Sequence, residues 1–123
     1  MGPGSSPQPT PHLNDFIERF EAAQAERGPV DLEEFLPDAA HPLFHDVLRE
    51  LVRIDLETGW ERGRPARLED YRTRFPGLFQ DPPSLREIAF EEYRLRCQAG
   101  ESPSPSEYRA RFGVDPAGWP AST

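Results

Sequence analysis

Two histidines are the residues whose types and spacing suggest metal binding. His41 and His45 are four positions apart, the separation that lets two imidazoles on one helical turn share a metal ion. Asp38 and Asp46 are the oxygen ligands nearby, and no cysteine is close to them in the sequence. In the competing interpretation, which we favour, His41 caps a helix and His45 is exposed beside it. We therefore predict no metal site.

A nucleophilic cysteine and a catalytic pair of carboxylates are the next candidates, and neither is favoured. Cys97 is the only cysteine, and it lies in a predicted helix among apolar neighbours, where we expect a small core residue rather than a reactive thiolate. The spacing of four glutamates is typical of solvated helix faces: Glu57, Glu61, Glu91 and Glu92. Glu92, for example, precedes Arg96 by four residues and is predicted to pair with it. We predict no catalytic residue, no cofactor and no enzymatic activity.

The charged residues exclude several classes of function. The sequence contains 14 basic residues, all of them arginine, against 22 acidic ones, and its formal net charge is −8. Without lysine the chain cannot supply the catalytic lysine of a kinase or the lysine of a phosphate-binding loop. Nucleic acid is excluded as a partner because phosphate binding requires a concentrated basic surface. Arginine instead favours planar pairing with carboxylates.

Membrane-spanning and targeting signals are missing from the sequence. No apolar run approaches the length that crosses a bilayer, and the N-terminus has no signal-peptide core. The single cysteine permits no intrachain disulfide, so an oxidising compartment is not implied. We expect a cytoplasmic protein that has no membrane partner.

The elements that position these residues repeat along the chain. The segment Leu48–Phe75 aligns with Leu85–Phe112 at a shift of 37 residues, and this shift places Gly63 on Gly100. In a weaker upstream copy, Gly28 aligns with Gly63 at a shift of 35 residues. A period of this length is typical of stacked supersecondary units that cover one another's apolar faces.

We predict an all-α fold, a small bundle of three long-helix/short-helix repeats with flexible termini. The repeat domain is expected over residues 12–113, and its units are 12–37, 42–76 and 82–113. Residues 1–11 are expected to form a disordered tail because they contain no apolar side chain beyond the first. Residues 114–123 are expected to form a C-terminal tail that Trp119 holds against the bundle.

Apolar periodicity and capping signals give the limits of the long helices. The first two are expected at about 12–27 and 42–62, and the third starts at either Asp81 or Ser84. The second helix has a wide apolar band, as expected for a central helix with two neighbours. Gly59 costs this helix about 1 kcal/mol relative to alanine. Either a close helix crossing or fraying near the helix end accounts for it.

The short helices differ in the quality of their start signals. Asp31 and Glu34 form a capping box for the first, and Ser104 and Glu107 form one for the last. The corresponding position in the middle repeat is Arg67, which has no capping side chain. We therefore expect the middle short helix to be looser.

Two aromatic pairs lie on the later short helices. Tyr71 and Phe75 are four residues apart, as are Tyr108 and Phe112, so each pair shares one face of a helical turn. We expect each pair to fold over the end of the preceding long helix and to pack in the core. The functional alternative is a recognition groove between successive pairs.

The middle repeat resembles a known type of signalling protein. Its sequence reads LRELVRIDLE and then WERGRPARLEDYRTRFP, and the residues that support the resemblance are Arg62, Gly63, Pro65, Tyr71, Arg74, Phe75 and Pro76. A second copy is represented by Gly100, Tyr108, Arg111 and Phe112. These residues resemble the region that precedes the catalytic domain in many planctomycete-type bacterial serine/threonine protein kinases. The resemblance implies a non-catalytic accessory domain, because the chain has no glycine-rich loop, HRD motif or DFG motif.

Our leading functional hypothesis is a non-catalytic helical module for protein interaction and regulation, associated with a kinase-type signalling protein. The candidate partner-binding surface surrounds the short helices: Trp60, Arg64, Tyr71, Arg72, Arg74, Tyr108, Arg109 and Arg111. The alternative is a structural spacer domain that has no specific ligand. Neither hypothesis specifies an oligomeric state.

Overall fold

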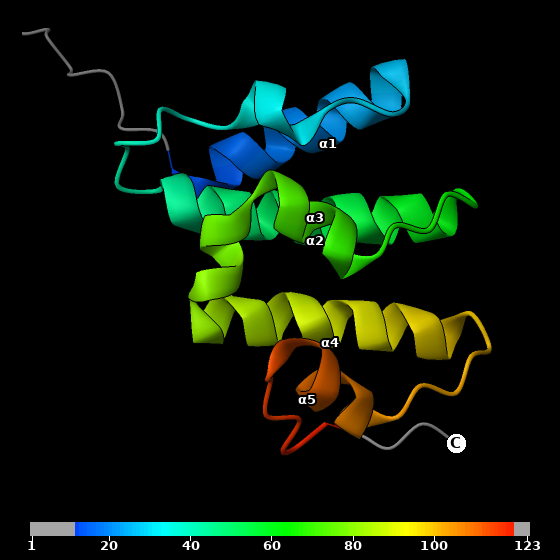
Figure 1. Cartoon of the computed structure of the whole chain (residues 1–123). Helices are drawn as coiled ribbons and strands as arrows, with labels where there is room; N and C mark the ends of the chain where they lie inside the picture. Colours follow the sequence, from blue (N-terminus) through cyan, green and yellow to red (C-terminus); the bar gives the residue numbers. More distant parts are fainter. Residues whose placement is uncertain (1–11, 120–123) are drawn as a thin grey trace, which may run out of the picture. The chain divides into compact units, whose positions relative to one another are not determined.

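The computed structural model describes residues 12–119, which form five α-helices and two short 3-10 helices and contain no strand (Figure 1). The elements are α1 (Leu13–Arg27), η1 (Leu32–Phe35), α2 (Phe44–Glu61), α3 (Leu68–Arg74), η2 (Pro76–Gln80), α4 (Pro82–Gln98) and α5 (Pro105–Phe112). The predicted all-α class is confirmed. The predicted N-terminal tail, residues 1–11, and residues 120–123 lie outside the described part of the chain. Among the described helices, none is long and apolar enough to cross a membrane.

The chain divides into two compact units, residues 1–47 and residues 48–123. In the described part of the first unit, α1 ends before Gly28, and η1 follows a short turn. The aromatic rings of Phe20 and Phe35 join the two helices at a centroid distance of 5.5 Å. Both α1 and η1 therefore contribute an aromatic side chain to the same contact, which fixes their pairing within this unit.

Local caps in the first unit differ from those expected. The short helix after Asp31 is a 3-10 helix, and the Asp31 carboxylate accepts a hydrogen bond from the Glu33 amide at 3.0 Å. The ring of His41 accepts a hydrogen bond from the amide of Leu43 through Nδ1, at 3.0 Å. This bond closes a turn before α2, which explains why α2 begins at Phe44, two residues after the predicted start.

In the second unit, α2 and α4 run side by side in the same direction (Figure 1). Three ion pairs join them. The nitrogen–oxygen distance is 3.0 Å in Arg49–Glu87, 3.6 Å in Arg53–Glu91 and 3.0 Å in Glu57–Arg94. The partners in each pair are 37 or 38 positions apart along the sequence, so successive turns of α2 meet successive turns of α4. A constant offset of this kind requires the two helices to be parallel and in register.

A 3-10 helix that the sequence reading missed connects α3 to α4. This helix, η2, begins with Pro76, and its central residue Leu78 is 1% exposed. Of the two start signals expected for α4, the earlier one is used, because the Asp81 carboxylate accepts a hydrogen bond from the amide of Ser84 at 3.2 Å. The connection between the helices is therefore a packed element rather than a loose loop.

The expected C-terminal tail is partly folded against α4 and α5. Val114 is buried, and the Trp119 indole lies 5.3 to 5.4 Å, between ring centroids, from three aromatic rings: Phe90, Tyr93 and Tyr108. Trp119 thus packs onto the helices as the sequence indicated. The end of the packed chain lies at least six residues beyond the predicted domain limit of residue 113.

Gly59 has a different role from the two that the sequence left open. After Gly63, which has a φ of 74°, the chain folds back, and the amide of Arg64 donates a 2.7 Å hydrogen bond to the Gly59 carbonyl. A Cβ atom on Gly59 would lie 2.7 Å from the carbonyl oxygen of Arg64. The glycine is therefore needed by the returning backbone of its own helix end, and neither a helix crossing nor fraying explains it.

We expect Gly59→Ala to lower the free energy of unfolding. The gain in helix propensity is about 1 kcal/mol. A 2.7 Å contact with backbone puts the overpacking cost at about 3 kcal/mol, the upper end of its usual range, so the net change is about 2 kcal/mol of destabilisation. Urea denaturation followed by circular dichroism measures it. Gly77→Ala is the matched control, because a Cβ at Gly77 meets nothing within 4 Å. A Gly59→Ala variant as stable as the parent chain contradicts this account of the turn.

Candidate functional site

Two tyrosine–carboxylate hydrogen bonds lie at equivalent positions of the second unit. The Tyr71 hydroxyl donates to Asp55 at 2.5 Å, and the Tyr108 hydroxyl donates to Glu92 at 2.8 Å. The tyrosines are 37 residues apart, and so are the two acidic residues. Burial, and then the charge of the neighbouring carboxylate, raises the pKa of both tyrosine hydroxyls well above the ordinary value. Both phenols therefore remain protonated donors and are not suited to act as bases or nucleophiles.

The tyrosines are buried, as the core-packing interpretation predicted. Tyr71 is 2% exposed and Tyr108 is fully buried, while Phe75 is also buried and Phe112 is half-buried. Tyr71 and Tyr108 belong to the predicted partner-binding surface, but in this structure neither side chain is exposed to a partner. Their hydroxyl groups are used within the fold, because a buried phenol requires a hydrogen-bond partner.

Glu92 occupies the centre of the polar contacts in the second unit, and its predicted solvated position is wrong. Its side chain is 1% exposed. It accepts hydrogen bonds from the amide of Leu68 at 2.9 Å, from the hydroxyl of Tyr108 at 2.8 Å and from the guanidinium of Arg111 at 2.8 Å. The first of these bonds caps α3, whose preceding residue Arg67 supplies no capping side chain. The start of α3 is thus capped by a residue from α4, so the expectation of an uncapped, looser helix is corrected.

Arg111 connects Glu92 to two more carboxylates. It binds Glu69 of α3 at 2.7 Å and Glu107 of its own helix at 2.8 Å. Burial acts to lower the pKa of Arg111, but the hydrogen bonds to Glu69 and Glu92 outweigh it and raise that pKa. The hydrogen bond from Arg111 in turn lowers the pKa of Glu69. Arg111, predicted as a surface residue, is therefore part of the internal network that joins α3, α4 and α5.

Arg96 extends this network along α4 instead of pairing with Glu92. Its guanidinium binds Glu107 at 2.5 Å, Glu101 at 3.0 Å and the Tyr108 hydroxyl at 3.1 Å. Burial acts to raise the pKa of Glu107, but hydrogen bonds from Arg96 and Arg111 hold it below the ordinary value. The carboxylates of this region are thus held as charged acceptors by arginines, which does not favour general acid catalysis.

The remaining members of the predicted surface lie at or near the solvent. Four arginines are exposed: Arg64, Arg72, Arg74 and Arg109. Trp60 is half-buried, and its indole N–H donates to the carbonyl of Ala66 at 3.2 Å. The guanidinium of Arg72 lies 5.4 Å from the centroid of the Phe112 ring, a distance typical of a cation–π contact. The Arg111 guanidinium lies 4.8 Å from the same ring, so two of the predicted residues contact a side chain that lines an apolar depression of the surface.

That depression is an apolar groove of about 580 Å³ formed by η2, the start of α4 and the end of α5. Its apolar lining consists of Phe79, Pro82, Pro83, Leu85, Phe112 and Val114. The rings of Phe79 and Phe112 are 5.9 Å apart between centroids. The sequence alternative was a groove between the Tyr71–Phe75 and Tyr108–Phe112 pairs, and of these four residues only Phe112 lines the observed groove. Sequence reasoning missed Phe79 and Val114, because neither belongs to the repeated four-residue aromatic pairs.

The candidate metal ligands and the candidate nucleophile are not brought together. One ring nitrogen of His41 is engaged by the Leu43 amide, and its ring lies 5.9 Å from that of Phe16. Between residues 12 and 119, no group of three histidine, cysteine, aspartate or glutamate side chains is arranged to hold a metal ion. Cys97 is a free, half-buried thiol.

Comparisons of the chain with protein-family models, with curated proteins and with solved structures found no match. The internal arginine–glutamate–tyrosine network joins the helices, and the apolar groove is the feature that is suited to receive a ligand.

Replacing Glu92 with alanine is expected to lower the free energy of unfolding by about 3 kcal/mol. The change removes the buried acceptor of three hydrogen bonds, which the Leu68 amide, the Tyr108 hydroxyl and the Arg111 guanidinium donate. Urea denaturation measures the loss. Glu87→Ala on the same helix is the control, since the Glu87 side chain is 54% exposed and its ion pair with Arg49 contributes about 0–1 kcal/mol. Equal effects of the two substitutions would refute a central role for Glu92.

The free energy of unfolding is expected to fall in acid. Glu69 and Glu107 have lower pKa values in the folded protein than in the unfolded chain. The stability that they contribute is therefore fully present above their pKa in the unfolded chain. It is lost as the pH falls through their pKa in the folded protein. We expect little change from pH 7 to about pH 5 and a decline below about pH 4.

Arg111→Gln should flatten this acid decline, because it removes a hydrogen-bond donor to both glutamates. Urea denaturation at pH 7, 4 and 3 measures the slope. The control is Arg109→Gln, since Arg109 is exposed and its ion pair is with Asp115 at 3.3 Å. An unchanged slope in Arg111→Gln contradicts the assigned cause of the pKa shifts.

Proposed function

We propose that the chain is a non-catalytic helical module that binds a protein partner, built from three long-helix/short-helix repeats and associated with a cytoplasmic serine/threonine kinase-type signalling protein. The apolar groove between η2 and α5 is the observation that carries the proposal. A stable monomer rarely leaves a mostly apolar depression of this size without a use. The partner would insert an apolar side chain between Phe79 and Phe112.

The repeat architecture is supported by residues that recur in equivalent contacts. Tyr71 and Tyr108 each bind a carboxylate of the preceding long helix. In the first unit, Phe20 aligns with Asp55 at a shift of 35 residues and Phe35 aligns with Tyr71 at a shift of 36, and the rings of Phe20 and Phe35 pack together. Gly28, Gly63 and Gly100 each follow a long helix and have a positive φ, which glycine adopts without strain.

The charges beside the groove favour a partner segment that carries a carboxylate. Arg72 is exposed and lies over the Phe112 ring, although it also acts electrostatically on Glu69. Arg86 lines the other side of the groove. Asp115 also lines the groove but already accepts a hydrogen bond from Arg109. We therefore expect the bound segment to place an aspartate or glutamate next to its apolar side chain.

Association with a kinase rests on the resemblance of residues 62–76 to the region that precedes planctomycete-type kinase domains. A catalytic role for this chain is disfavoured, because the carboxylates Glu91 and Glu92 are engaged by arginine or tyrosine donors. Genomic sequence tests the association: a kinase domain with HRD and DFG motifs is expected in the same or an adjacent reading frame. Its absence there would remove the kinase from the proposal and leave the binding module.

Selection from a displayed library of random 12-residue peptides tests the groove. Selected peptides are expected to share an apolar residue beside an acidic one, and Phe79→Ala is expected to weaken their binding about tenfold or more. Arg72→Ala should weaken binding less and reduce its salt dependence, because a charge at the rim acts mainly through long-range attraction. Fluorescence anisotropy of labelled peptides gives the affinities.

The control for Arg72→Ala is Arg64→Ala, since both arginines are exposed and only Arg72 contacts a groove side chain. Binding should be unchanged by Arg64→Ala. The alternative function is a structural spacer, favoured by the use of Tyr71, Tyr108 and Arg111 inside the fold. A library that yields no peptide dependent on Phe79 supports the spacer and rejects the groove.

A further inference from the structure

We propose that the face of α4 that carries Arg86 and Phe90 binds an amphipathic helix of a protein partner. Residues 113–119, which we call the C-terminal segment, cover this face until the incoming helix displaces Trp119. The surface shares Arg86 with the groove around Phe79, but its other lining residues, Phe90 and Trp119 among them, do not line that groove, so the inference goes beyond the function proposed above.

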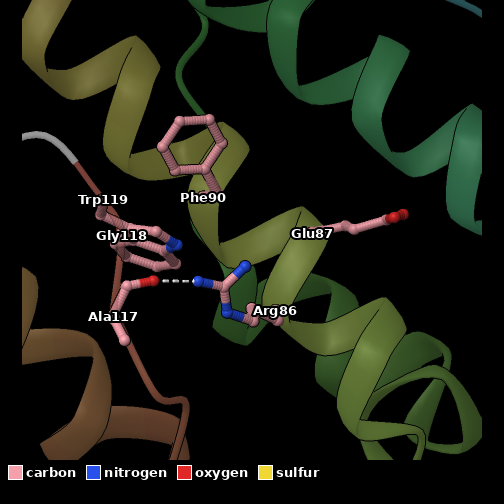
Figure 2. A pocket seen from close by; sticks show the side chains of 6 residues that line it. All are labelled: Arg86, Glu87, Phe90, Ala117, Gly118 and Trp119. Carbon is pink, nitrogen blue, oxygen red and sulfur yellow. Dashed lines mark hydrogen bonds between the residues drawn. The ribbon is translucent and has the colours of Figure 1, made fainter.

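The C-terminal segment occupies this face through one indole ring and two backbone contacts. The Trp119 ring lies 5.4 Å from the Phe90 ring and 5.9 Å from the guanidinium of Arg86. Arg86 donates hydrogen bonds to the carbonyl oxygen of Asp115, at 2.9 Å, and to that of Ala117. Figure 2 shows the indole and the Phe90 ring beside this bonded guanidinium, with Glu87 pointing away from them. Both hydrogen bonds are exposed, so water can replace them when the segment leaves.

The fit of Trp119 is incomplete in two respects. Its indole nitrogen is buried and has no hydrogen-bond partner in the described chain, which costs free energy in the covered state. A cavity of about 250 Å³ remains between the indole, Arg86 and Phe90. When the C-terminal segment covers this face, the indole nitrogen of Trp119 has no partner and apolar surface beside Phe90 is not fully packed. A better-fitting occupant would pack against that surface and release the indole.

The register of α2 and α4 indicates what that occupant is. On α2, Arg49 and Arg53 receive Glu87 and Glu91 of the neighbouring helix, at 3.0 and 3.6 Å. Adding 37 to positions 49 and 53 gives positions 86 and 90 on α4, which are arginine and phenylalanine. The face of α4 therefore has an arginine, Arg86, where α2 has Arg49, and a phenylalanine, Phe90, where α2 has Arg53. A matching helix carries a glutamate opposite Arg86 and an apolar side chain four residues later, opposite Phe90.

The α4 helix of a second copy does not fit this pattern. Its own Glu87 and Glu91 are already paired with Arg49 and Arg53 inside the second unit. Position 91 is also charged, whereas Phe90 favours an apolar neighbour. We therefore infer that the occupant is a helix of a partner protein with this glutamate and apolar residue four positions apart.

A synthetic peptide with the 17-residue sequence of α4 and the substitution Glu91→Leu serves as the probe. The full chain is used with Trp60→Phe, so that Trp119 is the remaining one of its two tryptophans. Binding of the peptide is expected to shift the Trp119 emission to longer wavelength as the indole enters water. Trp119→Ala should raise the affinity about tenfold, because the covering segment no longer competes.

A second experiment exchanges the charges of peptide Glu87 and protein Arg86. A peptide that also carries Glu87→Arg should bind at least about tenfold more weakly, and Arg86→Glu in the protein should restore its binding. Phe79→Ala, which alters the groove, should leave this binding unchanged, so the two sites are distinguished.

Two results would overturn the inference. One is peptide binding with an unchanged Trp119 emission, which places the peptide elsewhere. The other is a Trp119→Ala variant that retains its helical circular dichroism and binds no better than the parent chain. If Trp119→Ala does not fold, the charge exchange at Arg86 decides, and failure to restore binding rejects the proposal.

Discussion

The carboxylate of Glu92 is buried on α4 and accepts hydrogen bonds from the start of α3, from Tyr108 and from Arg111. Helices of seven and eight residues are not stable alone, because helix nucleation costs more than so few hydrogen bonds return. Burying a carboxylate is also unfavourable unless its oxygens are satisfied. The short helices need contacts outside themselves, and the Glu92 carboxylate needs hydrogen-bond donors. Both needs are met when α3 and α5 lie where each donates to Glu92 of α4.

Different chemistry positions the short helices in the two units. In the second unit, Tyr71 and Tyr108 form directional bonds to carboxylates. In the first unit, the rings of Phe20 and Phe35 make an apolar contact instead. A hydrogen bond fixes the orientation of both partners, whereas ring packing tolerates small rotations. The position of the short helix is therefore more tightly specified in the second unit than in the first.

Periodic patterns predicted the helices, the glycines that end them and the burial of Tyr71 and Tyr108, since each depends on residues close in sequence. The burial of Glu92 was missed because the four-residue spacing to Arg96 favoured a local ion pair. The signal for the true partner lay in the repeat, which aligns Glu92 with Asp55 and Tyr108 with Tyr71. The sequence did not identify Phe79 as a groove residue. It follows Pro76 and Gly77, a pair typical of a loop, and only tertiary packing makes that segment a 3-10 helix.

The packed connection between α3 and α4 also restricts how the length of this chain can change. Inserting one residue into η2 rotates every later position of α4 by about 100° relative to α3. Such a rotation carries the Glu92 carboxylate away from the Leu68 amide and turns an apolar position toward it. Insertions and deletions are therefore disfavoured between residues 75 and 81. They are tolerated more readily in the turns after the long helices, where the backbone lies at the surface and caps no other element.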